Sequence, residues 1–281
     1  MIRVLVPTDF SDHSYNALSY AHMLFQEVAV EFTLFNAYEA SALQLVGNKS
    51  PLRLGTIYKS LKVKSLEALK TLKKDIDARN EIKNHTYVFQ TYEGHLRDGV
   101  DAMSKNDFDF IIIGSKGATG LKEIFIGSVT QSIVSLHQEI PLLIVPEKAN
   151  FRVPDNIGFA TDFTRDYAKE ELAPLLTLTD LWKSTVRMVE VYDVPGLSPA
   201  QKTHLQHLEM LLMDVNYRFH VIPEFSSLEN CINAFNNELE IDLMVLIDYP
   251  KNFFERLMRE NVIKKMTFHT TLPFLILPGR N

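Results

Sequence analysis

The sequence predicts an α/β protein made of two tandem, doubly wound domains, each with a five-stranded parallel sheet flanked by helices. Short apolar runs alternate with amphipathic helical stretches, as in parallel sheets covered on both faces. The order of these runs then repeats. Thr8-Asp9-Phe10-Ser11 recurs as Thr161-Asp162-Phe163-Thr164, and Pro141–Pro146 recurs as Pro273–Pro278. A repeat this long indicates duplicated domains rather than a solenoid.

The elements of the first copy follow from apolar periodicity. We expect strands at 3–7, 31–38, 87–92, 108–114 and 142–145, and helices at about 11–25, 57–78, 96–104 and from 128 onwards. Residues 39–54 contain Ser, Asn, Gly and Pro without periodicity, which predicts a mobile loop.

The second copy has a shorter middle. We expect strands at 157–160, 186–192, 219–222, 242–247 and 274–277, with helices at about 202–213 and 228–238. The polar segment 147–155, bracketed by prolines, predicts the boundary between a domain at 1–147 and a domain at 153–281.

Composition restricts the class of protein. The chain has 281 residues, of which 46% are apolar and 23% charged, as in soluble globular proteins. A net charge of −6 argues against nucleic acid or an anionic membrane as the main partner. We find no apolar run long enough for a signal peptide or a spanning helix. The single cysteine, Cys231, cannot form an internal disulfide. We therefore expect a cytoplasmic protein.

The stretch that carries chemistry is 111–131, IIIGSKGATGLKEIFIGSVTQ, in which a strand pattern runs through glycines into a helix pattern. Glycines let the backbone approach an anion, and the N–H groups and dipole of a helix start attract phosphate. Ser128 suits an N-cap, and Gln131 completes a capping box. The spacing matches neither a P-loop, nor G-x-G-x-x-G, nor a nucleophile elbow. Alone, the loop fits an anion site and a plain connection equally well.

The full pattern Gly114-x2-Gly117-x9-Gly127-Ser128 resembles the nucleotide-binding signature of the universal stress protein family. The resemblance extends to VPTDFS at residues 6–11 and to PLLIVP at residues 141–146. It implies that the first domain binds ATP, or a related adenine nucleotide, with or without Mg²⁺. In such sheets the ligand lies at the carboxyl ends of the strands, at the switch point. The implied function is to couple the nucleotide state to a stress-response interaction.

The resemblance also assigns roles to single residues. The end of the first strand would face the adenosine, the backbone after the second strand would meet the adenine edge, and the glycine loop would hold ribose and phosphates. The implied set is Pro7, Thr8, Asp9, Ala37, Ile113, Gly114, Lys116, Gly117, Gly127, Ser128 and Val129. The family often has valine where this chain has Ala37. Asp9 also fits a turn or helix cap, because Asp162 keeps that residue type in the second copy.

The second copy lacks the glycine pattern. Asp248, Pro250, Arg259 and Glu260 stand in the corresponding region. Proline removes a donor, and a glutamate at a helix start repels phosphate. We therefore expect one nucleotide site, in the first domain, with the second domain as a structural partner.

Other functions stay open at this stage. The nine histidines are scattered and predict no metal site, and no catalytic residue stands out. A slow ATPase would need Glu123 or the 39–54 loop to complete a site with Mg²⁺. A purely structural interaction protein with a vestigial motif is a second alternative, and a lipid or metabolite ligand of the second domain a third.

The two fifth strands, 142–145 and 274–277, are short, apolar and bracketed by prolines. Domains of the resembled family dimerise through their fifth strands. Because an exposed apolar edge is an aggregation hazard, we expect these two strands to pair within one chain. A homodimer of the whole chain also stays open.

Overall fold

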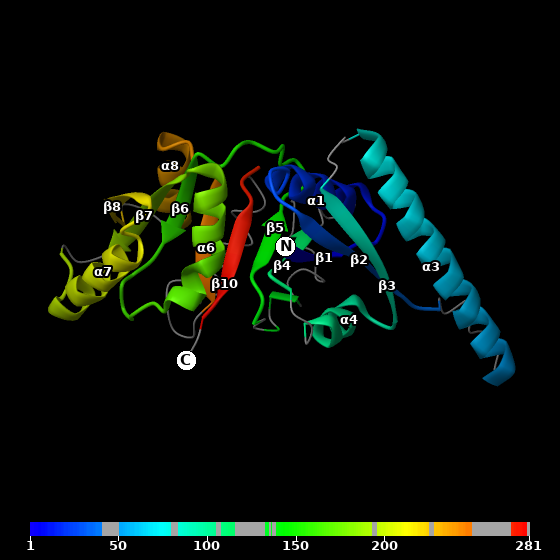
Figure 1. Cartoon of the computed structure of the whole chain (residues 1–281). Helices are drawn as coiled ribbons and strands as arrows, with labels where there is room; N and C mark the ends of the chain where they lie inside the picture. Colours follow the sequence, from blue (N-terminus) through cyan, green and yellow to red (C-terminus); the bar gives the residue numbers. More distant parts are fainter. Residues whose placement is uncertain are drawn as a thin grey trace.

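The computed structural model describes residues 1–40, 51–79, 84–104, 108–115, 133–134, 136, 139–192, 196–224, 228–248 and 271–279. The first half has the elements β1 (Ile2–Pro7), α1 (Asp12–Leu24), β2 (Val30–Tyr38), α3 (Pro51–Arg79), β3 (His85–Glu93), α4 (Leu96–Met103), β4 (Phe110–Gly114) and β5 (Leu142–Val145) (Figure 1). The second half has β6 (Asn156–Ala160), α6 (Lys169–Trp182), β7 (Thr185–Tyr192), α7 (Pro199–Leu211), β8 (Asn216–Pro223), α8 (Leu228–Glu238), β9 (Leu243–Asp248) and β10 (Phe274–Pro278).

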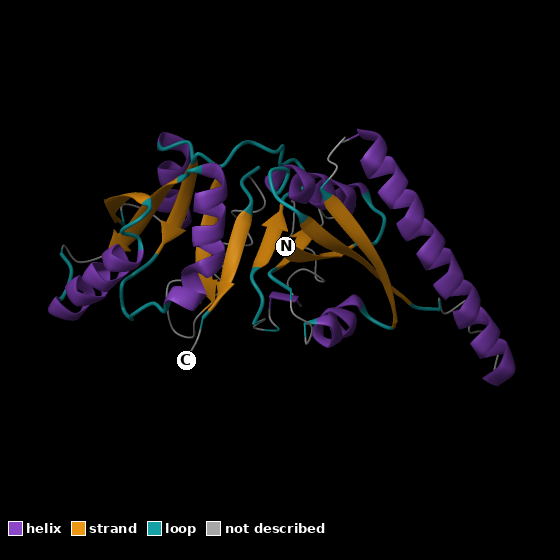
Figure 2. Ribbon diagram, in the orientation of Figure 1, coloured by secondary structure: helices purple, strands orange, loops and turns teal. Residues whose placement is uncertain are grey.

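The strands form one ten-stranded sheet in the order β3-β2-β1-β4-β5-β10-β9-β6-β7-β8. Within each half the five strands run parallel, and the second half repeats the strand order of the first. Helices flank this sheet (Figure 2). The α/β, doubly wound fold class predicted from the sequence is therefore confirmed.

The halves meet where β5 and β10 pair antiparallel, with Phe274 opposite Ile144 and Ile276 opposite Leu142. Both strands are fully buried apart from Pro278 at the end of β10. Each strand thus covers the sheet edge that the other half would leave exposed.

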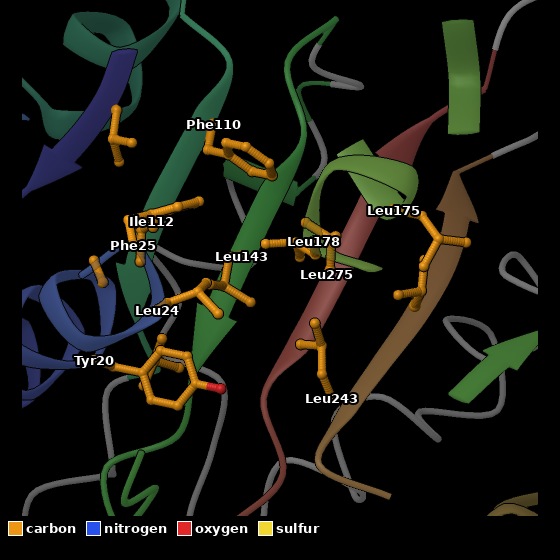
Figure 3. Packing of buried hydrophobic residues seen from close by; sticks show 14 of the residues in the cluster. Tyr20, Leu24, Phe25, Phe110, Ile112, Leu143, Leu175, Leu178, Leu243 and Leu275 are labelled. Carbon is orange, nitrogen blue, oxygen red and sulfur yellow. The ribbon is translucent and has the colours of Figure 1, made fainter. Parts of the chain in front are cut away.

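The apolar core is continuous across this junction. One layer joins Leu143 of β5 to Leu178 of α6 and Leu275 of β10 (Figure 3). A second layer, on the other face, contains Ile144 and Phe274. A hydrogen bond also links the halves, because the indole Nε1 of Trp182 in α6 donates to the carbonyl of Leu24 in α1 over 3.0 Å.

Local sequence explains several helix starts. The hydroxyl of Ser11 caps α1 by accepting from the backbone N–H of Ser14. Ser198 caps α7, Gln201 completes the capping box, and Pro199 occupies the first helical position.

None of the helices in the described ranges is long and apolar enough to cross a membrane.

The structure corrects two expectations. Helix α3 begins at Pro51, so residues 51–54 are helical and the loop interpretation is wrong for them; residues 41–50 lie outside the described ranges. The elements predicted from the sequence also lack α6, which has Pro174 in its interior. Proline lacks the N–H that a helix interior needs. The helix nevertheless forms because it buries Leu172, Leu175 and Leu178 against the sheet.

Candidate functional site

The candidate site lies where β1 and β4 end. These two strands are neighbours, with β2 on the far side of β1 and β5 on the far side of β4. The connections from β1 and β4 leave in opposite directions, so the carboxyl ends of these strands lie at the topological switch point. This is the place where doubly wound sheets generally bind ligands, in a crevice outside the strand ends.

The chain leaves β1 in a tight turn. The Thr8 hydroxyl accepts from the N–H of Phe10 at 3.0 Å and shares a hydrogen bond with the Ser14 hydroxyl at 2.9 Å. Phe10 has the positive φ of 63° that bends the chain into α1. Thr8 is buried, and Asp9 is exposed at the rim.

The Asp9 carboxylate also organises this turn. Its Oδ1 accepts from the backbone N–H of Ser11 at 3.1 Å and from the Ser11 hydroxyl. Burial acts to raise the pKa of Asp9, but the hydrogen bonds from Ser11 outweigh it and hold the pKa below its ordinary value. Asp9 is therefore anionic at neutral pH, and it can accept hydrogen bonds from hydroxyl groups but repels a phosphate.

A buried polar network supports the turn from below. The amide Nδ2 of Asn36, in β2, donates to the carbonyl of Thr8 at 2.7 Å. The hydroxyl of Ser65, in α3, donates to Oδ1 of the same amide at 2.6 Å. This network joins the end of β1 to β2 and α3, so buried hydrogen bonds fix the position of the turn after β1.

Gly114 ends β4 against the first turn of α1. A Cβ built on Gly114 would lie 2.5 Å from the backbone oxygen of His13. Glycine is thus required here for the close approach of helix and strand, whatever ligand the crevice takes. The next residue, Ser115, is fully buried, and its Oγ has no hydrogen-bond partner within the described ranges. An orphaned buried hydroxyl at this point is compatible with a polar ligand in the crevice.

The structure brings only part of the predicted set together. Pro7, Thr8, Asp9, Ile113 and Gly114 lie at the ends of β1 and β4, and Ala37 lies near the end of neighbouring β2. Lys116, Gly117, Gly127, Ser128 and Val129 lie outside the described residues, as do Glu123 and Gln131. The donors expected to contact phosphate are among the latter.

The second half reproduces the turn. The Thr161 hydroxyl accepts from the N–H of Phe163 at 3.1 Å, and Asp162 Oδ1 accepts from the N–H and hydroxyl of Thr164 at 3.1 and 2.8 Å. Phe163 has a positive φ of 52°, as Phe10 does. Threonine and aspartate at this position therefore build the turn in both copies, and they do not by themselves indicate a nucleotide.

The copies differ in what covers the turn. In the second half, α7 lies over it: Gln201 Nε2 donates to the carbonyl of Asp162 at 2.8 Å, and His204 Nδ1 contacts the carbonyl of Phe163 at 2.7 Å. Phe163 is fully buried, whereas Phe10 is 40% exposed. Among the described residues, no helix side chain holds the carbonyls of Asp9 and Phe10 in this way. This difference was not predicted from the sequence, because it depends on contacts of Gln201 and His204 with residues about 40 positions earlier in the chain.

A second asymmetry lies beneath the turn. Thr8 N donates to Phe35 O and Thr161 N donates to Val189 O, so the residues that follow, Asn36 and Glu190, occupy equivalent positions. Glu190 is 6% exposed, and burial together with the charge of Asp162 raises its pKa to about 6. A buried acid thus replaces the amide that supports the turn in the first half. Its charge at neutral pH disfavours an anionic ligand there.

This acid should also cost stability. Its pKa is raised from 4.5 to about 6 in the folded protein, so below pH 4.5 it is protonated in both the folded and the unfolded state and costs no stability. The cost develops as pH rises and is fully present above about pH 6. We expect Glu190→Gln to raise the free energy of unfolding at pH 7.5 by about 2 kcal/mol and to have little effect at pH 4. Urea denaturation at both pH values measures this. Glu27→Gln, at an exposed position, is the control. Equal effects of Glu190→Gln at both pH values would contradict the assignment.

The described residues contain no cluster of three or more metal-binding side chains.

Comparison with known proteins identifies the family of the chain. The family model described as "Universal stress protein family" matches residues 1–146, the half that carries the open turn and the glycine pattern. The chain belongs to the universal stress protein family.

Two curated universal stress proteins each match about half of this chain. Universal stress protein MJ0531 of Methanocaldococcus jannaschii is 29% identical over 143 residues, which are 51% of this chain and 81% of the relative. Universal stress protein MJ0577 of the same organism is 28% identical over 159 residues, covering 52% of this chain and 95% of the relative.

Solved structures show the same fold over the whole chain. A universal stress protein from Archaeoglobus fulgidus superposes with a TM-score of 0.71 at 17% identity, covering 98% of this chain and 97% of that one. The cytoplasmic domain of a prokaryotic cation chloride cotransporter reaches a TM-score of 0.53 at 13% identity, covering 100% of this chain and 97% of that one. Such different proteins share the fold, so function must be argued from the site.

Proposed function

We propose that this universal stress protein binds one adenine nucleotide, ATP, in the crevice at the ends of β1 and β4, and that the bound state alters its interactions under stress. The proposal rests on two features that occur together in the first half and are both missing from the second. The complete glycine–serine pattern follows β4 in the sequence, and the turn after β1 is left uncovered among the described residues.

The chemistry of the crevice supports this assignment. Asp9 is an anionic acceptor at the rim, suited to ribose hydroxyls, and the buried Ser115 Oγ has no partner in the part of the chain that the structure describes. The sequence supplies phosphate donors from Gly127-Ser128 at a helix start. Lys116 would follow the phosphate tail, with Mg²⁺ neutralising the remaining charge. The second half has a covered turn and a buried acid in place of this arrangement.

The buried, unpaired Cys231 and the absence of a spanning helix in the described ranges support a cytoplasmic location as part of the proposal. The pairing of β5 with β10 supports a role for the second half as a structural partner, so one chain would resemble a dimer of single domains.

Equilibrium dialysis with labelled ATP tests the proposal. We expect saturable binding that unlabelled ATP and ADP displace and that GTP displaces far less well, because the backbone near Ala37 would read the adenine edge. Assaying phosphate release from the same samples separates a binding protein from a slow ATPase. Failure of ATP to bind would favour an interaction protein with a vestigial motif.

A further inference from the structure

A polar cavity of about 580 Å³ lies at the junction of the two halves. It is lined by residues that follow β5, by the end of α8 and by residues that precede β9 and β10. It therefore lies at the amino ends of β9 and β10, and none of the described nucleotide-site residues lines it. Its volume falls within the roughly 300–1,000 Å³ of small-molecule sites.

The lining is rich in carboxamides: Asn150, Asn233, Asn236 and Asn237 all border the cavity. Asn236 is only 8% exposed, yet neither its Oδ1 nor its Nδ2 has a hydrogen-bond partner among the described residues. The Oδ1 of Asn233, one helical turn earlier on α8, is also buried, and no group in the described part of the chain bonds to it. Buried amides without partners are destabilising and rare in folded proteins, so these groups call for a ligand or ordered water.

The charges around the cavity balance. Lys148 and Arg152 contribute two positive charges, and Glu240 and Asp242 contribute two negative ones. The Asp242 carboxylate is anchored, because its Oδ2 accepts from the backbone N–H of Asn156 at 3.0 Å. A lining with no net charge does not favour a strongly anionic ligand such as a nucleotide or free phosphate.

We propose that this cavity, which we call the junction pocket, binds a small neutral polyhydroxylated molecule of the sugar or polyol class. Each hydroxyl group of such a molecule both donates and accepts, as does each carboxamide. Neighbouring hydroxyls would pair with Oδ1 and Nδ2 of Asn236 together. The carboxylate of Asp242 would accept from a further hydroxyl. The junction pocket is thus a second binding site, separate from the proposed nucleotide site and built where the two halves meet.

The test follows side-chain amide signals in ¹H–¹⁵N spectra of the full chain. Asn236→Leu identifies the Asn236 signal and removes its hydrogen-bonding groups at similar volume. Glucose, ribose, myo-inositol and trehalose are titrated in turn, with inorganic phosphate and ATP as separate arms. We expect at least one neutral compound to shift the Asn236 signal saturably at millimolar concentration. Asn236→Leu should weaken that binding at least tenfold and raise the melting temperature, because it deletes an unpartnered buried amide.

Controls separate this site from the nucleotide site and from general effects. Asn216→Leu, at an exposed position on β8, should leave polyol binding unchanged. Gly127→Glu should do so as well, so loss of ATP binding does not affect this test. Three results would overturn the proposal: a pocket that holds water only, with no compound shifting the signal; a response to phosphate or ATP alone; or polyol binding that survives Asn236→Leu.

Discussion

Ile144→Lys is expected to lower the free energy of unfolding by more than about 4 kcal/mol, the range of the most damaging substitutions. Ile144 is fully buried at the centre of the ten-stranded sheet, opposite Phe274 of β10 and beside Ile113 of β4. A lysine there must bury its charge or break the pairing of β5 with β10. Because the core layers cross this junction, we expect the damage to reach both halves.

Urea denaturation and small-angle scattering measure this effect. Ile144→Val should cost only about 0.5–1.5 kcal/mol, because it removes one methylene and no charge is buried. Val221→Lys, on the exposed side of β8 where Val221 is 49% exposed, should change stability by less than about 0.5 kcal/mol. An unchanged denaturation midpoint and compact shape for Ile144→Lys would show that the β5–β10 seam does not hold the halves together.

Gly127→Glu is expected to abolish ATP binding, weakening it by more than about 100-fold. Gly127 precedes Ser128 in the proposed phosphate-binding motif. A glutamate there would fill the phosphate position and bring a like charge to the helix start, where anions are otherwise stabilised. The melting temperature of the variant, measured alongside, separates a lost site from a lost fold.

The second half offers the matched controls. Glu260→Gln removes a charge in the region that corresponds to Gly127 and should leave ATP binding unchanged. Glu260→Gly should create no second site, since Pro250 still lacks a donor N–H. If Gly127→Glu left the affinity for ATP unchanged, the nucleotide would have to bind elsewhere in the chain.

The fold class could be predicted from the sequence because strand and helix periodicity are local signals, and because the order of the elements repeats along the chain. The strand Leu142–Val145 and the helix Leu228–Glu238 were predicted with the observed bounds. Helix α6 was not, because Pro174 interrupts the pattern and the helix depends on tertiary burial of its leucines. The start of α3 at Pro51 was missed although proline suits the first helical position, because residues 39–54 show no apolar periodicity.

The site was predictable only as a set of residue types. The sequence left two roles open for Asp9, nucleoside contact and turn or cap residue, and the geometry of both copies shows the turn role of threonine and aspartate. The packing role of Gly114 depends on where the His13 carbonyl lies, which no local pattern encodes. The same holds for the burial of Glu190 and for α7 over the second turn, since both depend on contacts between residues about 30 to 40 positions apart.

Calorimetric titration of the full chain with ATP tests the central claim most directly, because it counts sites. The account predicts a stoichiometry of one nucleotide per chain, contributed by the half that matches the family model. Two equivalent sites per chain would contradict it, because the covered second turn should exclude a nucleotide. No measurable binding would contradict it equally, since the open first turn would then hold no nucleotide at all.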